Sequence, residues 1–160
     1  MILDPAMPPA LELGGLIIES HRRLVGVDLA PPELAEAEQA TWLYEDAPFC
    51  VLAHNGAADP VFIYANRAAQ RCFEYGWEEF LRLPSRFSAE APNRAERQRL
   101  LDAVARDGFA AGYKGLRVAK SGRRFWIEQG VVWQLTDAHG MAQGQAASFP
   151  IWRDVQAASS

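Results

Sequence analysis

The hydrophobic period of this chain changes at Pro48. Before it, residues 11–24 and 33–44 carry apolar side chains at the spacing of an amphipathic helix. After it, residues 49–54 and 61–64 form short runs rich in β-branched and aromatic side chains, which is typical of strands. A turn rich in Asn, Gly, Asp and Pro separates these two runs, so we expect them to form a hairpin.

The rest of the chain repeats the order of helices followed by strands. Three helices are predicted next, over residues 67–75, 77–83 and 94–106. Three strands separated by Gly-containing turns follow, over residues 113–119, 124–135 and 142–153. Strands joined by short turns pair antiparallel, and the helices must bury their apolar sides against them. The sequence therefore predicts an α+β fold, a five-stranded antiparallel sheet with short helices on one face and an N-terminal helical extension.

Length and composition fit one folded domain. The chain has 160 residues, of which 49% are hydrophobic and 22% charged, a balance typical of globular proteins. We divide it into a loose tail (residues 1–10), N-terminal helices (11–45), a core (46–155) and a second tail (156–160). The core contains all five predicted strands, so a binding site built on the sheet lies there.

The same sequence argues against several classes of protein. The net charge is −4 and no run of Lys and Arg forms a basic stripe, which disfavours nucleic-acid binding. The two cysteines, Cys50 and Cys72, belong to no CxxC motif or Cys/His cluster, which disfavours a structural metal site. Residues 1–10 do not resemble a signal peptide, and no apolar run approaches the roughly 20 residues that span a membrane. We therefore expect a cytoplasmic protein without membrane contact.

Three stretches of the core resemble the PAS signature. Residues 62–69 (FIYANRAA) and 76–80 (GWEEF) resemble its strand, helix and aromatic-Glu-Glu turn, and residues 120–126 (KSGRRFW) resemble the hairpin after its long helix. Within PAS-like proteins the chain most resembles the MEKHLA family. The stretches that are distinctive for this family lie at residues 58–62, 83–90, 92–94 and 144–150. The resemblance covers residues 14–154.

This resemblance implies a sheet that curves around a cavity, which relatives use for flavin, haem, small metabolites or nothing. We therefore expect a sensory or regulatory domain that binds a small molecule or a protein partner in signalling. The first alternative is a ligand-free protein-interaction module. The second is a small pocket enzyme of the isomerase type, whose carboxylate would be Glu128 if the predicted strand phase is reversed. No triad, carboxylate pair or phosphate loop supports catalysis, so we expect no enzyme.

Particular residues disfavour two cofactors of PAS relatives. Flavin photochemistry would need a cysteine before the Arg-Phe pair, where this chain has Ser85, and an asparagine after the Phe-Trp pair, where it has Ile127. Haem would need an axial histidine on the helix over residues 94–106, which has none. The three histidines are expected on an exposed helix, at a strand end and in a turn: His21, His54 and His139.

The candidate cavity residues come mainly from strand alternation. Over residues 124–135, alternation places Phe125, Ile127, Gln129 and Trp133 on one face. Gln129 would then be a buried amide that needs a hydrogen-bonding partner, either a ligand or an internal group. The full predicted set of cavity residues is Cys50, Tyr64, Asn66, Cys72, Arg86, Phe125, Ile127, Gln129 and Trp133.

Several of these residues also have an ordinary structural role. Asn66 precedes a predicted helix and can cap it. Arg86 can pair with Glu90 instead of an anionic ligand, and the two cysteines can serve as small apolar core residues. No residue is assigned a catalytic or metal-binding role.

The N-terminal helix is predicted to mediate a homodimer. Its apolar stripe consists of Leu13, Leu16, Ile17 and Leu24. The outer face of the sheet is expected to expose apolar residues that need a cover: Trp126, Val132 and Val118. Together these surfaces exceed the apolar area that a monomer tolerates, so we expect a second subunit to cover them. In the alternative, the helix folds back on its own sheet and the protein is monomeric.

Overall fold

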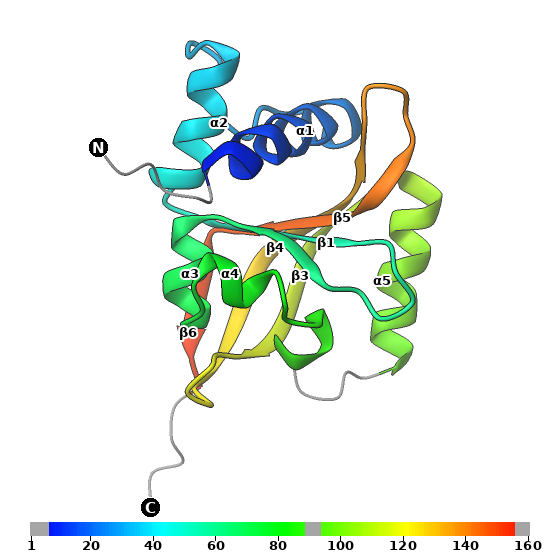
Figure 1. Ribbon diagram of the computed structural model, residues 1–160. Coiled ribbons are helices and arrows are strands. Elements are labelled where there is room, and N and C mark those ends of the chain that lie inside the picture. The colour runs from blue at the N-terminus through cyan, green and yellow to red at the C-terminus, as the bar shows by residue number, and fades with distance from the viewer. Residues whose placement is uncertain (1–6, 89–93, 156–160) are drawn as a thin grey trace, which may run out of the picture.

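The structure is a computed structural model that describes residues 7–88 and 94–155 (Figure 1). Its helices are α1 (Met7–Val25), α2 (Glu36–Glu45), α3 (Arg67–Phe73), α4 (Trp77–Phe80) and α5 (Arg94–Asp107), with a 3-10 helix, η1 (Ser85–Ser88). Its strands are β1 (Cys50–Asn55), β2 (Phe62–Ala65), β3 (Phe109–Val118), β4 (Arg124–Thr136), β5 (Ala142–Phe149) and β6 (Ile151–Asp154). The tail predicted over residues 1–10 is helical from Met7 onwards, whereas residues 1–6 and 156–160 lie outside the described part.

Helices α1 and α5 end within one residue of their predicted bounds, and a glycine follows each of them. Gly26 and Gly108 follow α1 and α5 with φ angles of +89° and +84°, a region that other residues rarely adopt. The N–H of Gly26 donates to the carbonyls of His21 and Arg22, which satisfies the end of α1. By contrast, α2 begins at Glu36, three residues later than predicted.

The sheet is antiparallel, and its strands lie in the order β2-β1-β5-β4-β3. The last predicted strand is divided at Pro150 into β5 and β6, because proline has no N–H for the ladder. Both pieces pair with β4. Strand β5 pairs with residues 131–136 of β4, and β6 pairs with residues 125–128 of β4. The predicted antiparallel sheet is therefore confirmed, with its final strand in two segments.

Helices α1 and α2 lie on one face of the sheet and α3 and α4 on the other (Figure 1), and each face buries its own hydrophobic cluster. Under α1 and α2 lies what we call the N-terminal cluster, which includes Ile17, Ile18, Leu43, Tyr44, Val51, Ala53, Tyr64, Trp77, Trp133 and Leu135. Under α3 and α4 lies the phenylalanine cluster, which includes Cys50, Leu52, Phe62, Cys72, Phe73, Phe80, Phe125, Ile127 and Phe149. Successive residues of β1 alternate between the two clusters, as the pleat of a strand requires. Short helices on one face and an N-terminal extension on the other are thus confirmed.

Strand β4 changes face at Gln129, which corrects the predicted alternation. Gln129 has a φ of +55°, and the register with β3 shifts there, as in a β-bulge. Phe125 and Ile127 therefore enter the phenylalanine cluster, whereas Trp133 enters the N-terminal cluster on the opposite face. The left-handed backbone turns the Gln129 side chain to solvent, so it is not the buried amide that alternation predicted.

Trp133 attaches α1 to the sheet. Its indole N–H donates to Ser20 Oγ at 3.0 Å, and its ring meets His21 edge to face with the centroids 4.8 Å apart. His21 was predicted to be exposed, but it is buried and its Nδ1 lies 2.8 Å from the carbonyl oxygen of Val27. Helix α1 thus packs on the sheet of its own chain, and Val132, which was predicted to be exposed, is buried. The homodimer itself stays a prediction.

The burial of His21 makes stability depend on pH. Burial lowers the pKa of His21, although the hydrogen bond with Val27 and the charge of Asp28 oppose the shift. As the pH drops below about 6.5, the unfolded chain binds a proton at His21 more readily than the folded chain does. We therefore expect the contribution of His21 to stability to be complete above that pH and to be lost as the pH falls toward the lowered pKa.

Urea unfolding of the full chain at about pH 7.5 and about pH 5.5 measures this effect. His21→Asn should flatten the pH dependence of the unfolding free energy, because asparagine does not titrate. The matched change at the exposed His139 should leave the dependence as it is in the wild type. Equal pH dependence in the wild type and His21→Asn would contradict the prediction.

Candidate functional site

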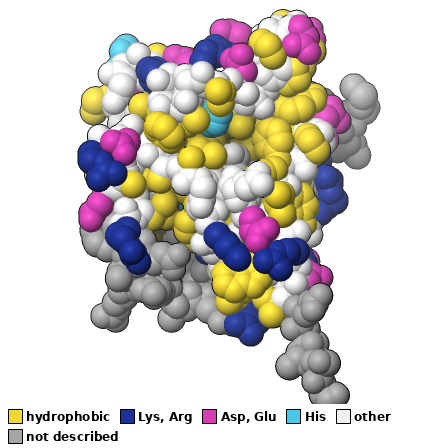
Figure 2. Space-filling model, turned by 180° about the vertical axis from the view of Figure 1, so that it is seen from behind, with side chains coloured by type: hydrophobic (Ala, Val, Ile, Leu, Met, Phe, Trp, Pro, Cys, Tyr) yellow, Lys and Arg dark blue, Asp and Glu magenta, His cyan; other side chains and the backbone are white. Residues whose placement is uncertain are grey.

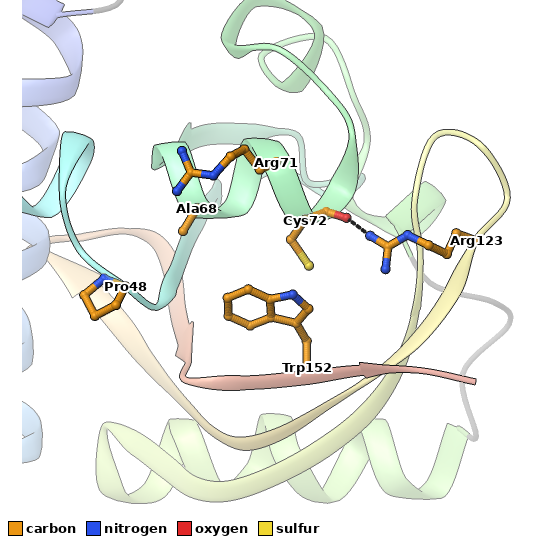
Figure 3. Close-up of a pocket in the computed structure, with 6 residues that line it drawn as sticks. All are labelled: Pro48, Ala68, Arg71, Cys72, Arg123 and Trp152. Atoms are coloured by element: carbon orange, nitrogen blue, oxygen red, sulfur yellow. Dashed lines mark hydrogen bonds between the residues drawn. The ribbon is translucent and has the colours of Figure 1, made fainter. Parts of the chain in front are cut away.

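A groove with a volume of about 290 Å³ lies between α3 and β6 (Figure 3). Ala68, Arg71 and Cys72 line it from one face of α3, because residues three and four apart share a helix face. Trp152 of β6 lies opposite, with its ring toward Cys72 (Figure 3). The remaining lining residues are Pro48 and Arg123. The groove is therefore a surface site with an aromatic wall and two arginines at its border.

The two arginines of the groove differ in their partners. The guanidinium of Arg123 hydrogen-bonds Asp154, the carbonyl of Cys72 and, at 3.2 Å, Oε2 of Glu74. These contacts tie the β3–β4 hairpin to α3 and β6, and the guanidinium of Arg123 is paired with both carboxylates. Arg71 is exposed and has no ion-pair partner within residues 7–88 and 94–155. Arg71 is therefore the arginine of the groove whose guanidinium no carboxylate of the described residues pairs.

The face predicted to hold a ligand cavity is filled by phenylalanine rings. Phe73 stands at its centre, with ring centroids 5.1 Å from Phe125, 5.9 Å from Phe80 and 6.2 Å from Phe149. All these contacts are edge to face, a favourable geometry for aromatic packing. Phe125 and Ile127, two of the predicted cavity residues, are buried in this cluster. The described aromatic side chains thus occupy the space in which the sequence analysis predicted a ligand cavity.

The predicted site residues are divided among several places. Cys50, Cys72, Phe125 and Ile127 come together in the phenylalanine cluster. Tyr64 and Trp133 lie in the N-terminal cluster across the sheet, and Gln129 is exposed. Arg86 is also exposed, pairs with Asp59 at 3.1 Å and lies over the ring of Phe87; Glu90 lies outside the described residues. Only Cys72 of the predicted set lines the groove.

Sequence reasoning missed most of the groove. Pro48, Ala68, Arg71, Arg123 and Trp152 were not proposed as site residues. Pro150 could have indicated that Trp152 belongs to a separate strand, because a proline interrupts the ladder. The side chains after it then alternate independently of those before it. The helical spacing of residues 68, 71 and 72 could have placed Arg71 beside Cys72.

Asn66 caps α3, as predicted, and its side chain bonds three other segments. Its Oδ1 accepts from the backbone N–H groups of Ala69 and Val51, both at 3.0 Å. Its Nδ2 donates to the carbonyls of Leu43 and Phe49, also at 3.0 Å. Asn66 is completely buried, so every polar atom of its amide is committed within the protein rather than facing a ligand.

Tyr64 carries a buried hydroxyl that has no hydrogen-bonding partner among the described residues. Burial raises the pKa of Tyr64, and the neighbouring Tyr44 adds to the shift. The ring contacts Tyr44 and Trp77 edge to face, within the N-terminal cluster. Tyr64 therefore stays protonated and serves mainly as an aromatic core residue.

Glu128, the carboxylate considered for isomerase-type chemistry, lies in an ion-pair cluster at the surface. Arg153 donates to its Oε1 at 2.8 Å, and Lys114 Nζ lies 3.6 Å away. The hydrogen bonds from Arg153 are the main reason that the pKa of Glu128 is lowered. This group is an ionised ion-pair partner rather than a base inside a cavity.

Among the described residues, no three side chains of His, Cys, Asp or Glu gather closely enough to hold a metal ion. Among the helices of residues 7–88 and 94–155, none combines the length and apolar character needed to cross a membrane.

The arrangement of the described elements is shared with PAS domains. The PAS domain of a protein from Colwellia psychrerythraea has a TM-score of 0.58 and 16% identity, over 74% of this chain and 95% of that one. An RNA-binding light-oxygen-voltage receptor has a TM-score of 0.60 and 22% identity, over 79% of this chain and 35% of that one. The LOV domain of a blue-light activated histidine kinase from Erythrobacter litoralis has a TM-score of 0.53 and 19% identity, over 68% of this chain and 96% of that one.

At these identities the likeness establishes a PAS-like fold and nothing about ligands. The model of the MEKHLA domain matches residues 11–154, and the chain belongs to this family. Both the fold and the family that the sequence motifs indicated are thus confirmed. No curated protein matches the sequence.

We expect Asn66→Ala to lower the free energy of unfolding by about 3–4 kcal/mol, because it removes a helix cap and leaves buried backbone groups unpaired. Asn55→Ala is the matched control. Its Oδ1 also accepts from backbone N–H groups, those of Ala57 and Val61, but at the partly exposed end of β1, so about 1 kcal/mol is expected. Urea unfolding followed by tryptophan fluorescence measures both, and similar losses would show that the internal network of Asn66 is not special.

We expect Tyr64→Phe to leave stability unchanged or to raise it by about 1 kcal/mol, because it removes a buried hydroxyl without a partner. Tyr44→Phe should instead destabilise the protein by about 1 kcal/mol or more, since the Tyr44 hydroxyl accepts from Gln70 Nε2 at 3.1 Å. Thermal and urea unfolding of the two variants test this difference. A loss of stability in Tyr64→Phe as large as in Tyr44→Phe would reveal a partner for the Tyr64 hydroxyl.

Proposed function

We propose that this MEKHLA domain is a sensory or regulatory module of the cytoplasm that binds a compact anionic molecule in the groove between α3 and β6. The observation that carries the proposal is the position of Arg71. Its exposed guanidinium, without an ion-pair partner within the described ranges, borders a groove whose opposite wall is Trp152.

The chemistry of the groove suits a small molecule with a flat apolar part and a negative group. An arginine guanidinium donates two parallel hydrogen bonds to a carboxylate or a phosphate. An indole ring offers a broad apolar surface for a flat group. The volume of about 290 Å³ is at the lower end of ligand pockets, which favours a compact molecule.

A ligand in the groove would act on the rest of the domain through α3. This helix begins at Asn66, whose amide also holds the end of α2 and the start of β1. Its other end is fixed by the hydrogen bond from Arg123 to the carbonyl of Cys72. A change in the position of α3 therefore reaches the N-terminal helices and the sheet, which is how such a module would pass on a signal.

A ligand-free interaction module is the second candidate function. Figure 2 shows hydrophobic side chains gathered over the middle of the rear face, with basic and acidic side chains below them. An apolar surface with a charged border is typical of a protein-binding face. This candidate is favoured if no compact anion binds in the groove.

The proposal predicts that the full chain binds benzoate and phenyl phosphate more tightly than benzyl alcohol, their neutral counterpart. Titration calorimetry or ligand-observed NMR measures the dissociation constants. Arg71→Gln should weaken binding of both anions about tenfold or more, because a hydrogen bond to a charged group is lost. Trp152→Leu should weaken all three probes, since it removes the aromatic wall.

Arg82→Gln is the matched control, because Arg82 is an exposed arginine that does not line the groove. Its affinities should equal those of the wild type. Equal affinity for benzoate and benzyl alcohol, or equal loss in Arg71→Gln and Arg82→Gln, would rule out the groove as the anion site. Failure of both anions to bind at millimolar concentration would do the same.

A further inference from the structure

The two cysteines of the chain are neighbours in space although 22 positions separate them in sequence. Cys50 opens β1 and Cys72 lies in the last turn of α3. Both are free thiols in the phenylalanine cluster, and each affects the pKa of the other. Because the chain has no other cysteine, these two can only pair with each other within one molecule.

The two cysteines differ in exposure and in their place relative to the groove. Cys50 is completely buried, whereas Cys72 is 4% exposed and lines the groove. In Figure 3 its Sγ points into the groove, toward Trp152. A small reagent that enters the groove therefore meets Cys72 first and has no direct path to Cys50.

Electrostatics favour the thiolate on Cys72. The pKa of Cys72 is lowered, first because the Cys50 thiol donates a hydrogen bond to it and further because the positive charge of Arg123 lies nearby. The pKa of Cys50 is raised by the same hydrogen bond and by burial. A thiolate is the nucleophilic form of cysteine, so the more accessible sulfur is also the more reactive one.

We propose that Cys72 and Cys50 form a peroxide-sensitive pair, in which Cys72 is oxidised first and Cys50 then closes a disulfide. The Cys72 thiolate attacks one oxygen of hydrogen peroxide, the O–O bond breaks, and Cys72 becomes a sulfenic acid while hydroxide leaves. The Cys50 sulfur then attacks the Cys72 sulfur, an S–S bond forms, and the sulfenic oxygen leaves as water. In total, two thiols and one peroxide give one disulfide and two waters.

The disulfide would change more than the two sulfurs. A disulfide brings the sulfurs to about 2.05 Å with a restricted torsion, so β1 and α3 must adjust to each other. The carbonyl of Cys72 accepts from Arg123, which also bonds Asp154 of β6. Oxidation therefore moves the carbonyl of Cys72, which Arg123 connects to β6 at the edge of the sheet. This switch does not require the anionic ligand, because peroxide needs only access through the groove.

The first test uses the wild-type chain, so it does not depend on a variant that folds. Brief alkylation of the native protein with iodoacetamide, followed by peptide mapping, gives the reaction rate of each cysteine. Cys72 should react at least about tenfold faster than Cys50, because it is both more accessible and more ionised. In urea the two rates should become similar, which identifies the fold as the cause. Equal rates in the native protein would overturn the proposal.

The second test treats the full chain with hydrogen peroxide and measures its intact mass after blocking free thiols. The wild type should lose two hydrogens, and a thiol reductant should restore them. Cys50→Ala should accumulate a sulfenic acid at Cys72 that dimedone traps, whereas Cys72→Ala should give little dimedone adduct at Cys50. Circular dichroism establishes that both variants are folded. A wild type that passes directly to sulfinic acid, without a disulfide, would refute the role of Cys50.

Discussion

The side chain of Asn66 holds together segments that are distant in sequence. It accepts from the N–H groups of Val51 and Ala69 and donates to the carbonyls of Leu43 and Phe49, at a place that solvent does not reach. Without this amide the four backbone groups would be buried without these partners, which is costly. The relative positions of α2, β1 and α3 thus depend on one residue, and α3 in turn places one wall of the groove.

The elements with strong local signals could be predicted from the sequence, but the face change of β4 could not. Gly26, Gly108 and Asn66 end or begin helices by local chemistry that a sequence displays. Gln129 carries no such signal, because its left-handed backbone is imposed by pairing. Strand β4 pairs with β6 up to Glu128 and with β5 from Val131 onwards. Gln129 lies between these two paired segments. The interruption at Pro150 in the neighbouring strand therefore coincides with the bulge.

The candidate site could be predicted only in part, for reasons of volume and register. The sequence identified Phe125 and Ile127 as inward-facing, and they are. It could not reveal that phenylalanine rings from α3, α4 and three strands fill the space they face, since packing depends on tertiary geometry. The groove lies on the other side of α3, and Trp152 reaches it only because the chain starts a new strand after Pro150.

Helix α3 has only seven residues, too few to be stable by itself in water. Its position must therefore come from its two ends and from its buried face. Asn66 fixes the first end, and Arg123 fixes the second by bonding the carbonyl of Cys72. The cation of Arg71 and the thiol of Cys72 both project from this second half of the helix, next to the Arg123 contact. A chemical event at either group thus acts on the end of α3 that the β3–β4 hairpin holds, through Arg123 and through the N–H of Lys120, which donates to the carbonyl of Phe73 at 2.9 Å.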